Sequence, residues 1–320
     1  MNLNIKESFY KNNILILSPI KINMKLFLTI TGCWTAFVIL ILTLSHFTSS
    51  YSTISNGIIE IKIPNNQGGS SVFSEGILSI GWVYSQIFIT FGSVFYGLYA
   101  LILIYKIISK EVASAQISLW LTQPISRNQL VITKYISIFA MLSITYLFQL
   151  VMLLSFSLFT YDYKDYFVNI LLGGLQNYVY IFFIYTLFFL IANIFLEKVL
   201  VVNVICIVIL SLMLLSSTLE MMLMVSQSGD NTMIKISKFM GPQIFLTDVF
   251  PYAKNLEPHE IIVKEQILPN GGSIIEKLIL DKIDKVNILK YILCNLAMIV
   301  ISNLSLFITM NIFKRKSFNI

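Results

Sequence analysis

Side chains that can bind a metal or carry out catalysis are few in this sequence and stand far apart. The two histidines, His46 and His259, lie in different parts of the chain. Cys33, Cys206 and Cys294 are isolated from one another, so they fit neither a metal-ligand spacing nor a disulfide framework. No glycine is followed by lysine, which excludes the Walker A phosphate-binding loop. We therefore expect a chain that is not an enzyme, holds no metal and does not hydrolyse ATP by that route.

The composition indicates where such a chain resides. Hydrophobic residues make up 57% of the sequence, charged residues 12%, and the mean hydropathy is +0.81. Soluble domains are about 45–50% apolar and about 25% charged. The balance is therefore typical of a protein that crosses a membrane several times.

Six uncharged stretches are long enough to cross about 30 Å of hydrocarbon as helices. A cleaved signal peptide is disfavoured for the first stretch, because it lies too far from Met1 and no convincing cleavage site follows it. We predict an all-α fold with six transmembrane helices, both termini being cytoplasmic. The six predicted spans are Leu26–Phe47, Ser79–Tyr105, Tyr135–Phe159, Phe167–Leu196, Val199–Leu219 and Tyr291–Phe313.

The cytoplasmic side follows from the distribution of charge. Basic residues outnumber acidic ones before Leu26, between Lys106 and Lys134, and after Phe313, and these segments share one side of a six-span chain. The long segments on the other side carry a slight excess of acid. Positively charged loops stay in the cytoplasm. This topology accounts for the net charge of +6, so we infer no nucleic-acid partner.

Polar side chains within the predicted spans are neutral. No Asp, Glu, Lys or Arg lies deep in any of them, which argues against a proton-coupled or sodium-coupled carrier. The amides have two interpretations, hydrogen bonding between helices and the lining of a substrate path, and we favour the first. These amides are Gln86, Gln149, Asn169, Gln176, Asn177, Asn193, Asn203, Asn295, Asn303 and Asn311.

The segment "ISLWLTQPISRNQLVITK", Ile117–Lys134, separates the second and third apolar stretches. The pattern of Ser109–Leu121 predicts a short helix, which Pro124 ends or kinks. Ser126 and Gln129 have the spacing of a capping box, which begins the third long helix. The result is an elbow that can transmit movement of a cytoplasmic partner to a membrane helix. An ordinary positively charged loop remains the alternative.

Arg127 in this segment is one of two arginines, the other being Arg315, among 22 lysines and arginines. A planar guanidinium binds carboxylates and carbonyl groups in a geometry that lysine cannot reproduce. Our hypothesis is that Arg127 pairs with a carboxylate or with backbone carbonyls, either in this chain or in a partner.

The run Lys110–Phe139 resembles the cytoplasmic loop of ABC-2 type transporter permeases. Glu111 takes the place of the acidic residue that follows the second span in that family. Pro124-Ile125-Ser126-Arg127 matches the family's Pro-Ile-Ser-Arg element, and Lys134 matches the lysine that opens the third span. Leu119, Trp120 and Leu121 stand in the family's leucine-rich stretch, whereas Ala115 and Gln116 replace its usual Gly-Thr pair.

Three shorter segments agree with this resemblance. "NIKESFYKNN", Asn4–Asn13, is similar to the family's amphipathic N-terminal elbow. "KISKFMGPQIFL", Lys235–Leu246, resembles a segment that follows the fifth span in many of these permeases, and "IFKRKSFNI", Ile312–Ile320, resembles their basic tail.

The resemblance implies a permease subunit of an ABC exporter that moves a lipid-like, drug or peptide substrate outward. Two copies of a separate ATPase bind ATP and Mg, and a second permease chain, identical or different, completes a dimer in the cell membrane of a bacterium. The alternative is a non-transporting immunity or sensor component with an ABC-2-like fold. The residues expected to contact the ATPase are Lys110, Glu111, Gln116, Leu119, Trp120, Pro124 and Arg127.

These expectations divide the chain into four parts. Residues 1–25 form a cytoplasmic amphipathic elbow, and 26–219 form the first five transmembrane helices with the coupling loop 106–134. Residues 220–290 form an extracellular loop, and 291–320 form the sixth helix and a basic tail. Within the extracellular loop, the spacing of apolar residues in Ser273–Val286 predicts an amphipathic helix.

Two further features depend on local pattern. The alternation of apolar and polar residues from Ile59 to Ile63 predicts a short strand outside the membrane. Ser93, Gly97 and Ala100 are small residues at helical spacing, and they predict a close helix contact within the chain or with a second permease.

Overall fold

Among the residues that it describes, the computed structural model contains six helices that are long and apolar enough to cross a membrane, which confirms the predicted number. The residues it describes are 16–51, 57–62, 83–113, 126–159, 163–225, 241–247, 249, 259–267, 273–280 and 285–315. The second span combines four elements, η1 (Ser85–Thr90), α4 (Phe91–Ile104), η2 (Tyr105–Ser109) and α5 (Lys110–Ala113). The other spans are α2 (Met24–Tyr51), α7 (Arg127–Ser157), α8 (Tyr163–Ile194), α9 (Val199–Val225) and α11 (Ile288–Arg315).

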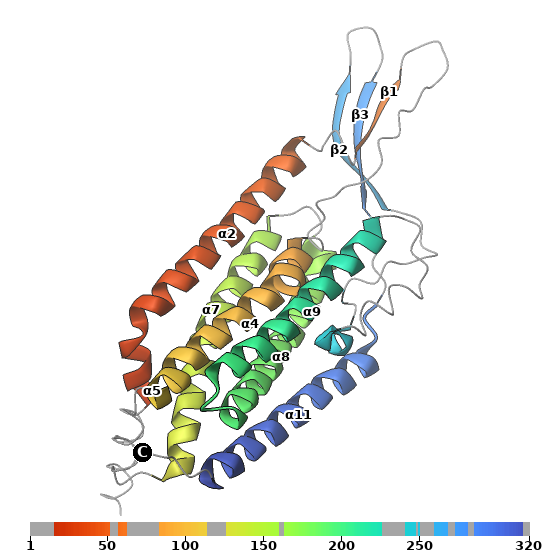
Figure 1. The fold of residues 1–320 in the computed structure, drawn as a ribbon. Coiled ribbons are helices and arrows are strands. Elements are labelled where there is room, and N and C mark those ends of the chain that lie inside the picture. The colour runs from red at the N-terminus through yellow and green to blue at the C-terminus, as the bar shows by residue number, and fades with distance from the viewer. Residues whose placement is uncertain are drawn as a thin grey trace, which may run out of the picture.

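The helices lie side by side in a bundle with α8 at its centre (Figure 1). α8 packs against α4, α7, α9 and α11. In the most apolar 18-residue stretch of each span, the share of residues that are buried is between 50% and 67% for the second span, α7 and α8. The corresponding share is 17% for α2, 28% for α9 and 22% for α11. These last three helices are therefore the periphery of the bundle. We call the end that holds α5 and the last turn of α11 the tail end, and the opposite end the sheet end.

The second span departs from a regular α-helix at both ends of α4. η1 and η2 are π-helical turns, which are rare and interrupt the usual backbone hydrogen-bond ladder. In η1, the Phe88 carbonyl accepts a hydrogen bond of 3.1 Å from Asn177 Nδ2 on α8. Gly92 follows the turn so closely that a Cβ at this position would lie 2.0 Å from the Ile87 carbonyl oxygen. Glycine is therefore required for the close approach.

Replacing Gly92 with alanine should destabilise the protein by about 1–3 kcal/mol, the usual cost of overpacking a buried position. The reason is that Ile87 contributes a backbone atom, which cannot rotate away as a side chain can. Gly32→Ala is the matched control, because a Cβ at Gly32 would meet no atom within 4 Å. Thermal unfolding of the two variants in the same detergent measures the difference, and equal stabilities would show that η1 does not depend on Gly92.

Close packing at the small residues of α4 is confirmed, and it lies within this chain. Ser93, Gly97 and Ala100 are all buried. A Cβ at Gly97 would lie 2.3 Å from Leu210 Cδ2 on α9 and 3.7 Å from the Phe188 ring on α8. Gly97 therefore lets α4 approach both neighbours.

Four amides within the spans form hydrogen bonds outside their own helix. Asn177 and Gln149 bond another helix, as the favoured interpretation predicted, whereas Asn169 and Gln176 bond residues 249 and 247, which are not helical. Besides Asn177, Gln149 Nε2 donates to Thr35 Oγ1 on α2 over 2.7 Å, and Asn169 Nδ2 donates to the Val249 carbonyl over 2.8 Å. Gln176 Oε1 accepts from the Thr247 hydroxyl over 2.8 Å. Three others, Asn193, Asn295 and Asn303, instead donate to a carbonyl of their own helix.

A three-stranded antiparallel sheet stands beyond the sheet end of the bundle (Figure 1). Its strands are β1 (Gly57–Lys62), β2 (His259–Ile267) and β3 (Ser273–Leu280), in the order β1-β3-β2. β1 confirms the strand predicted from the alternation in this region. The predicted all-α fold class is confirmed for the bundle, to which the sheet is an addition outside the spans.

The amphipathic helix predicted for Ser273–Val286 is wrong over Ser273–Leu280. This segment is the central strand β3, and its backbone pairs with β1 on one side and β2 on the other. Pairing with two strands distant in sequence overrides a local helical pattern. The segment also does not continue into the sixth span, because residues 285–287 are not helical and Asn287 Oδ1 accepts a hydrogen bond from the Lys290 backbone N–H.

Two segments outside the spans pack against the bundle. Residues 16–22 are helical and lead through a turn at Asn23 into α2, and the Ile16 carbonyl accepts a hydrogen bond from Ser137 on α7. The amphipathic elbow predicted for Asn4–Asn13 lies outside the described residues. At the sheet end, η3 (Pro242–Phe245) places Gln243 in the bundle, where its Nε2 donates to the Met213 carbonyl over 2.7 Å.

Candidate coupling site

The candidate site lies at the tail end, where α5 and the start of α7 flank the loop between the second and third spans. Lys110 and Glu111 are the first two residues of α5, and Arg127 is the first residue of α7. Of the other predicted contact residues, Gln116, Leu119, Trp120 and Pro124 lie outside the described residues. The structure therefore describes the two ends of the loop, at α5 and at the start of α7. We call these ends the attachment points of the loop.

α7 begins as the sequence predicts. The Ser126 hydroxyl accepts a hydrogen bond from the Gln129 backbone N–H over 3.3 Å, and Gln129 Oε1 accepts one from the Ser126 backbone N–H over 3.1 Å. This reciprocal pair is a capping box. It fixes the first turn of α7 directly after the loop.

Arg127 joins the start of α7 to the end of α11. Its Nη1 donates a hydrogen bond of 3.3 Å to the Lys314 carbonyl. The hypothesis that this arginine pairs with a carboxylate or a backbone carbonyl is thereby confirmed, and the acceptor belongs to this chain. The contact brings the sixth span to the site, although α7 and α11 are far apart in sequence.

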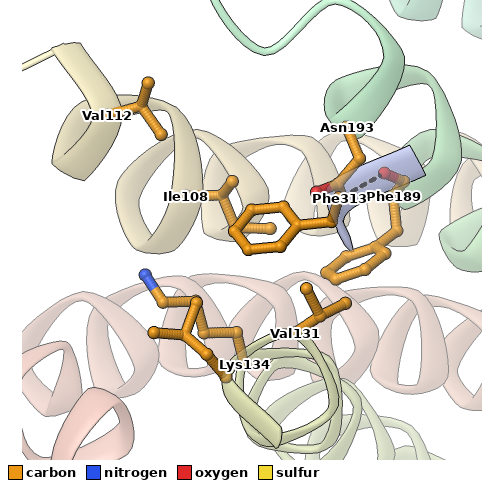
Figure 2. A pocket seen from close by; sticks show the side chains of 8 residues that line it. Ile108, Val112, Val131, Lys134, Phe189, Asn193 and Phe313 are labelled. Carbon is orange, nitrogen blue, oxygen red and sulfur yellow. Dashed lines mark hydrogen bonds between the residues drawn. The ribbon is translucent and has the colours of Figure 1, made fainter. Parts of the chain in front are cut away.

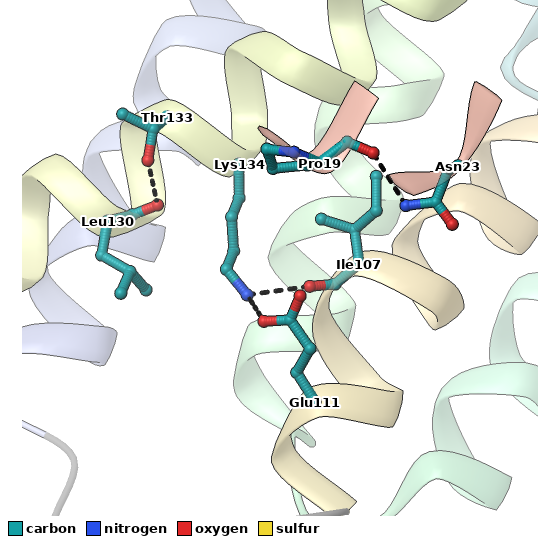
Figure 3. A network of polar contacts seen from close by, with 7 residues as sticks. All are labelled: Pro19, Asn23, Ile107, Glu111, Leu130, Thr133 and Lys134. Carbon is teal, nitrogen blue, oxygen red and sulfur yellow. Dashed lines mark hydrogen bonds and ion pairs between the residues drawn. The ribbon is translucent and has the colours of Figure 1, made fainter. Parts of the chain in front are cut away.

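The strongest contact at the site is one that the sequence did not predict. Lys134, in the second turn of α7, forms an ion pair with Glu111, and its Nζ also donates a hydrogen bond of 2.8 Å to the Ile107 carbonyl (Figure 3). We call Lys134, Glu111 and the Ile107 carbonyl the Lys134 clasp. The side chains of Lys134 and Glu111 are 8% and 20% exposed, so both charges are largely removed from water. The clasp therefore ties the two ends of the loop together.

The clasp also contacts the π-turn η2. A π-turn disturbs the regular ladder, and every buried backbone carbonyl needs a donor. Ile107 lies within η2 and takes its side-chain donor from Lys134. The same solution is found at η1, where Asn177 donates to Phe88. Both irregular turns of the second span are thus held by a polar side chain from a neighbouring span.

A cavity of about 10 Å³, the space of about one water molecule, lies beside Lys134 (Figure 2). Four spans contribute to its wall, since Phe189 and Asn193 come from α8 and Phe313 comes from α11. The second, third, fourth and sixth spans therefore meet beside the clasp. The remaining lining residues are Ile108, Val112, Leu130 and Val131.

Lys134 could have been singled out by one signal in the sequence. Glu111 and Lys134 have opposite charges, and each lies where the loop meets an apolar stretch. Adding up the charges of the loop treats the side chains of Glu111 and Lys134 as exposed to solvent, whereas Lys134 is buried. The pairing depends on the path of the chain between them, which periodicity does not specify.

Arg127→Lys tests the bond between α7 and α11. Arg127 is exposed, so we expect a change in stability within about 0.5 kcal/mol. ATP turnover of the assembled transporter should nevertheless fall, because lysine cannot reproduce the planar guanidinium contact. The measurement is ATP hydrolysis by the purified complex, and full turnover in the variant would show that the guanidinium is not needed.

The fold defines a multi-pass helical membrane protein in which the Lys134 clasp joins the second span to the third. Residues 33–264, from α2 into β2, match the ABC-2 family transporter protein family. The chain belongs to that family. No curated protein and no solved structure matches it. It is accordingly a permease component of an ABC transporter, and members of this family are membrane components that are not themselves catalytic and generally associate with an ABC ATPase.

Proposed function

We propose that this chain is the permease subunit of an ABC exporter, and that ATPase movement enters it through the loop between the second and third spans. The observation that carries this proposal is the Lys134 clasp. It joins the two attachment points of the loop through a largely buried ion pair and a carbonyl of η2. Moving the loop therefore displaces the second and third spans together.

The orientation in the proposal follows from charge. The tail end of the bundle carries Lys110, Arg127, Lys198 and Lys314, in segments where basic residues prevail. Such segments remain on the cytoplasmic side of a membrane. The tail end then faces the ATPase, and the sheet stands outside the cell.

The proposed assembly has two ATPase subunits and two permease chains. ATP and Mg bind to the ATPases, whose closure moves the loop. Lys110, Glu111 and Arg127 stand at the attachment points of the loop, and Gln116, Leu119, Trp120 and Pro124 supply the remaining contacts. Leu119 and Trp120 are the proposed anchors, because buried aromatic and apolar side chains often dominate the affinity of an interface.

A non-transporting immunity or sensor component is the second candidate. It differs from the exporter in one measurable way, since its signal does not require ATP turnover coupled to movement of a substrate. The proposed cargo of the exporter is an amphipathic molecule, lipid-like, drug or peptide, in a bacterial cell membrane.

Purification of the tagged chain from its native membrane in mild detergent tests the proposal. We expect a separate ATPase with Walker motifs to be recovered and to hydrolyse ATP in the complex. Mass spectrometry identifies the bound chain, and a catalytic-site variant of that ATPase controls for contaminating hydrolysis. Recovery of the folded permease without any ATPase in several detergents would favour the non-transporting candidate.

A further inference from the structure

Halfway along the spans, α2, α4 and α7 bring several neutral polar side chains together. Thr31 on α2 shares a hydrogen bond of 2.9 Å with Thr145 on α7. One turn further along both helices, Gln149 Nε2 donates to Thr35. Tyr99 on α4 lies beside the Thr31–Thr145 pair. These contacts join helices that are distant in sequence into one polar cluster inside the apolar bundle.

Several polar atoms in this cluster are buried and have no hydrogen-bond partner. They are Trp34 Nε1, the Tyr96 hydroxyl and Gln149 Oε1. Their residues are between 0% and 6% exposed. The Trp34 N–H and the Tyr96 hydroxyl lie next to each other. An unpaired polar group is costly in the interior of a membrane, where water does not compensate it.

The unpaired atoms have a definite chemistry. The indole N–H of Trp34 donates, the Tyr96 hydroxyl donates or accepts, and Gln149 Oε1 accepts. A hydroxyl group can both accept a hydrogen bond from an indole N–H and donate one to an amide oxygen. The predicted spans around the cluster contain no charged residue that would balance an ion. The cluster therefore suits an uncharged hydroxyl-bearing group.

Aromatic rings form the apolar part of the same region. The Trp34 and Phe95 rings are stacked with their centroids 4.1 Å apart, and the Tyr96 ring lies edge-on to Trp34 at 6.2 Å. Tyr96 also contacts Tyr146 on α7, with centroids 5.5 Å apart. An amphipathic molecule can thus place its hydroxyl on the polar atoms and its apolar part against these rings.

The helix that covers the cluster is the least buried of the six spans. In α2, 17% of the most apolar 18-residue stretch is buried, the smallest share among the six spans. Two hydrogen bonds connect its middle to α7, one between Thr31 and Thr145 and one that Thr35 accepts from Gln149. Displacement of α2 toward the lipid would expose the polar atoms to a molecule arriving from the bilayer.

We propose that the α2–α4–α7 cluster is a binding site for the uncharged, hydroxyl-bearing head group of an amphipathic cargo that enters from the membrane. As a cargo site, it rests on the exporter function proposed above and specifies its substrate class. Trp34 and Tyr96 donate to the head group, and Gln149 accepts from it.

Trp34 itself reports binding. With Trp82 and Trp120 replaced by phenylalanine, Trp34 becomes the sole tryptophan, and the chain is placed in phosphatidylcholine nanodiscs. Three probes share one acyl chain, namely 1-monooleoylglycerol, methyl oleate and oleate. We expect a saturable change in Trp34 emission with 1-monooleoylglycerol, and binding at least about tenfold weaker for the other two.

Two matched variants separate binding from folding. Tyr96→Phe removes an unpaired hydroxyl, so the protein should fold normally and bind 1-monooleoylglycerol about three- to tenfold more weakly. Tyr180→Phe removes another buried unpaired hydroxyl, on α8, and should leave binding unchanged.

Equal effects of the two variants, equal binding of oleate, or no saturable response to any probe would each overturn the proposal. This assay contains no ATPase. A failed binding site therefore leaves recovery of the ATPase unaffected, and loss of the ATPase leaves the binding measurement intact.

Discussion

Replacing Lys134 with methionine should destabilise the permease by about 3–5 kcal/mol, because it leaves the carboxylate of Glu111 without its partner. Methionine fills a similar volume but carries no charge. Glu111→Gln should have an effect of the same order, since it leaves the largely buried Lys134 ammonium without its carboxylate partner. Thermal unfolding in detergent, followed for each variant under the same conditions, measures both losses.

The double variant Glu111→Gln/Lys134→Met should be more stable than either single variant. Neither residue then carries a buried charge, and the remaining loss is the hydrogen bond to the Ile107 carbonyl, about 1–3 kcal/mol. Lys198→Met is the matched control, because Lys198 is an exposed lysine in the turn between α8 and α9. If the double variant loses the sum of the two single effects, the two residues do not interact and the clasp has no energetic role.

The second large effect concerns association with the ATPase. Trp120→Ala combined with Arg127→Ala should weaken binding by at least about 30-fold, which corresponds to about 2 kcal/mol for the loss of an aromatic anchor. Trp120 is the aromatic side chain of the loop, and Arg127 stands where the loop joins α7. Quantitative co-purification from membranes, normalised to the amount of permease, gives the change.

The Trp120→Ala/Arg127→Ala variant needs one control for folding and one for the position of the lost charge. Its thermal unfolding should match wild type within about 1 kcal/mol, because the proposal gives both side chains a role in the interface rather than in the fold. Lys198→Ala places a charge loss at the same end of the bundle but outside the loop, and should leave association unchanged. Wild-type association in a folded Trp120→Ala/Arg127→Ala chain would remove this loop from the interface.

The sequence predicted features that depend on neighbours along the chain. The number of spans follows from long uncharged stretches, and Ser126 and Gln129 show the capping box by their spacing alone. The unusual arginine at 127 correctly indicated a specific acceptor, which is the Lys314 carbonyl. In each case the signal lies in composition or short-range spacing.

Features that depend on distant partners were not predicted. The ion pair of Lys134 with Glu111 requires the chain to return on itself, and the π-turn at η2 has no characteristic period. Ser273–Leu280 has apolar residues at helical spacing, yet β1 and β2 pair with it on both sides. Tertiary pairing decided these elements, and local pattern carried no information about it.

The central claim is that loop movement reaches the bundle through the Lys134 clasp. Its direct test is a distance between two spin labels, one at Ile136 on the outer face of α7 and one at exposed Lys198, in a chain whose three cysteines have been replaced. In complex with the ATPase, ATP should change this distance by about 1–2 Å or more in wild type. The change should be absent in folded Glu111→Gln/Lys134→Met. An equal change in that variant would contradict the claim, because α7 would then move without the clasp.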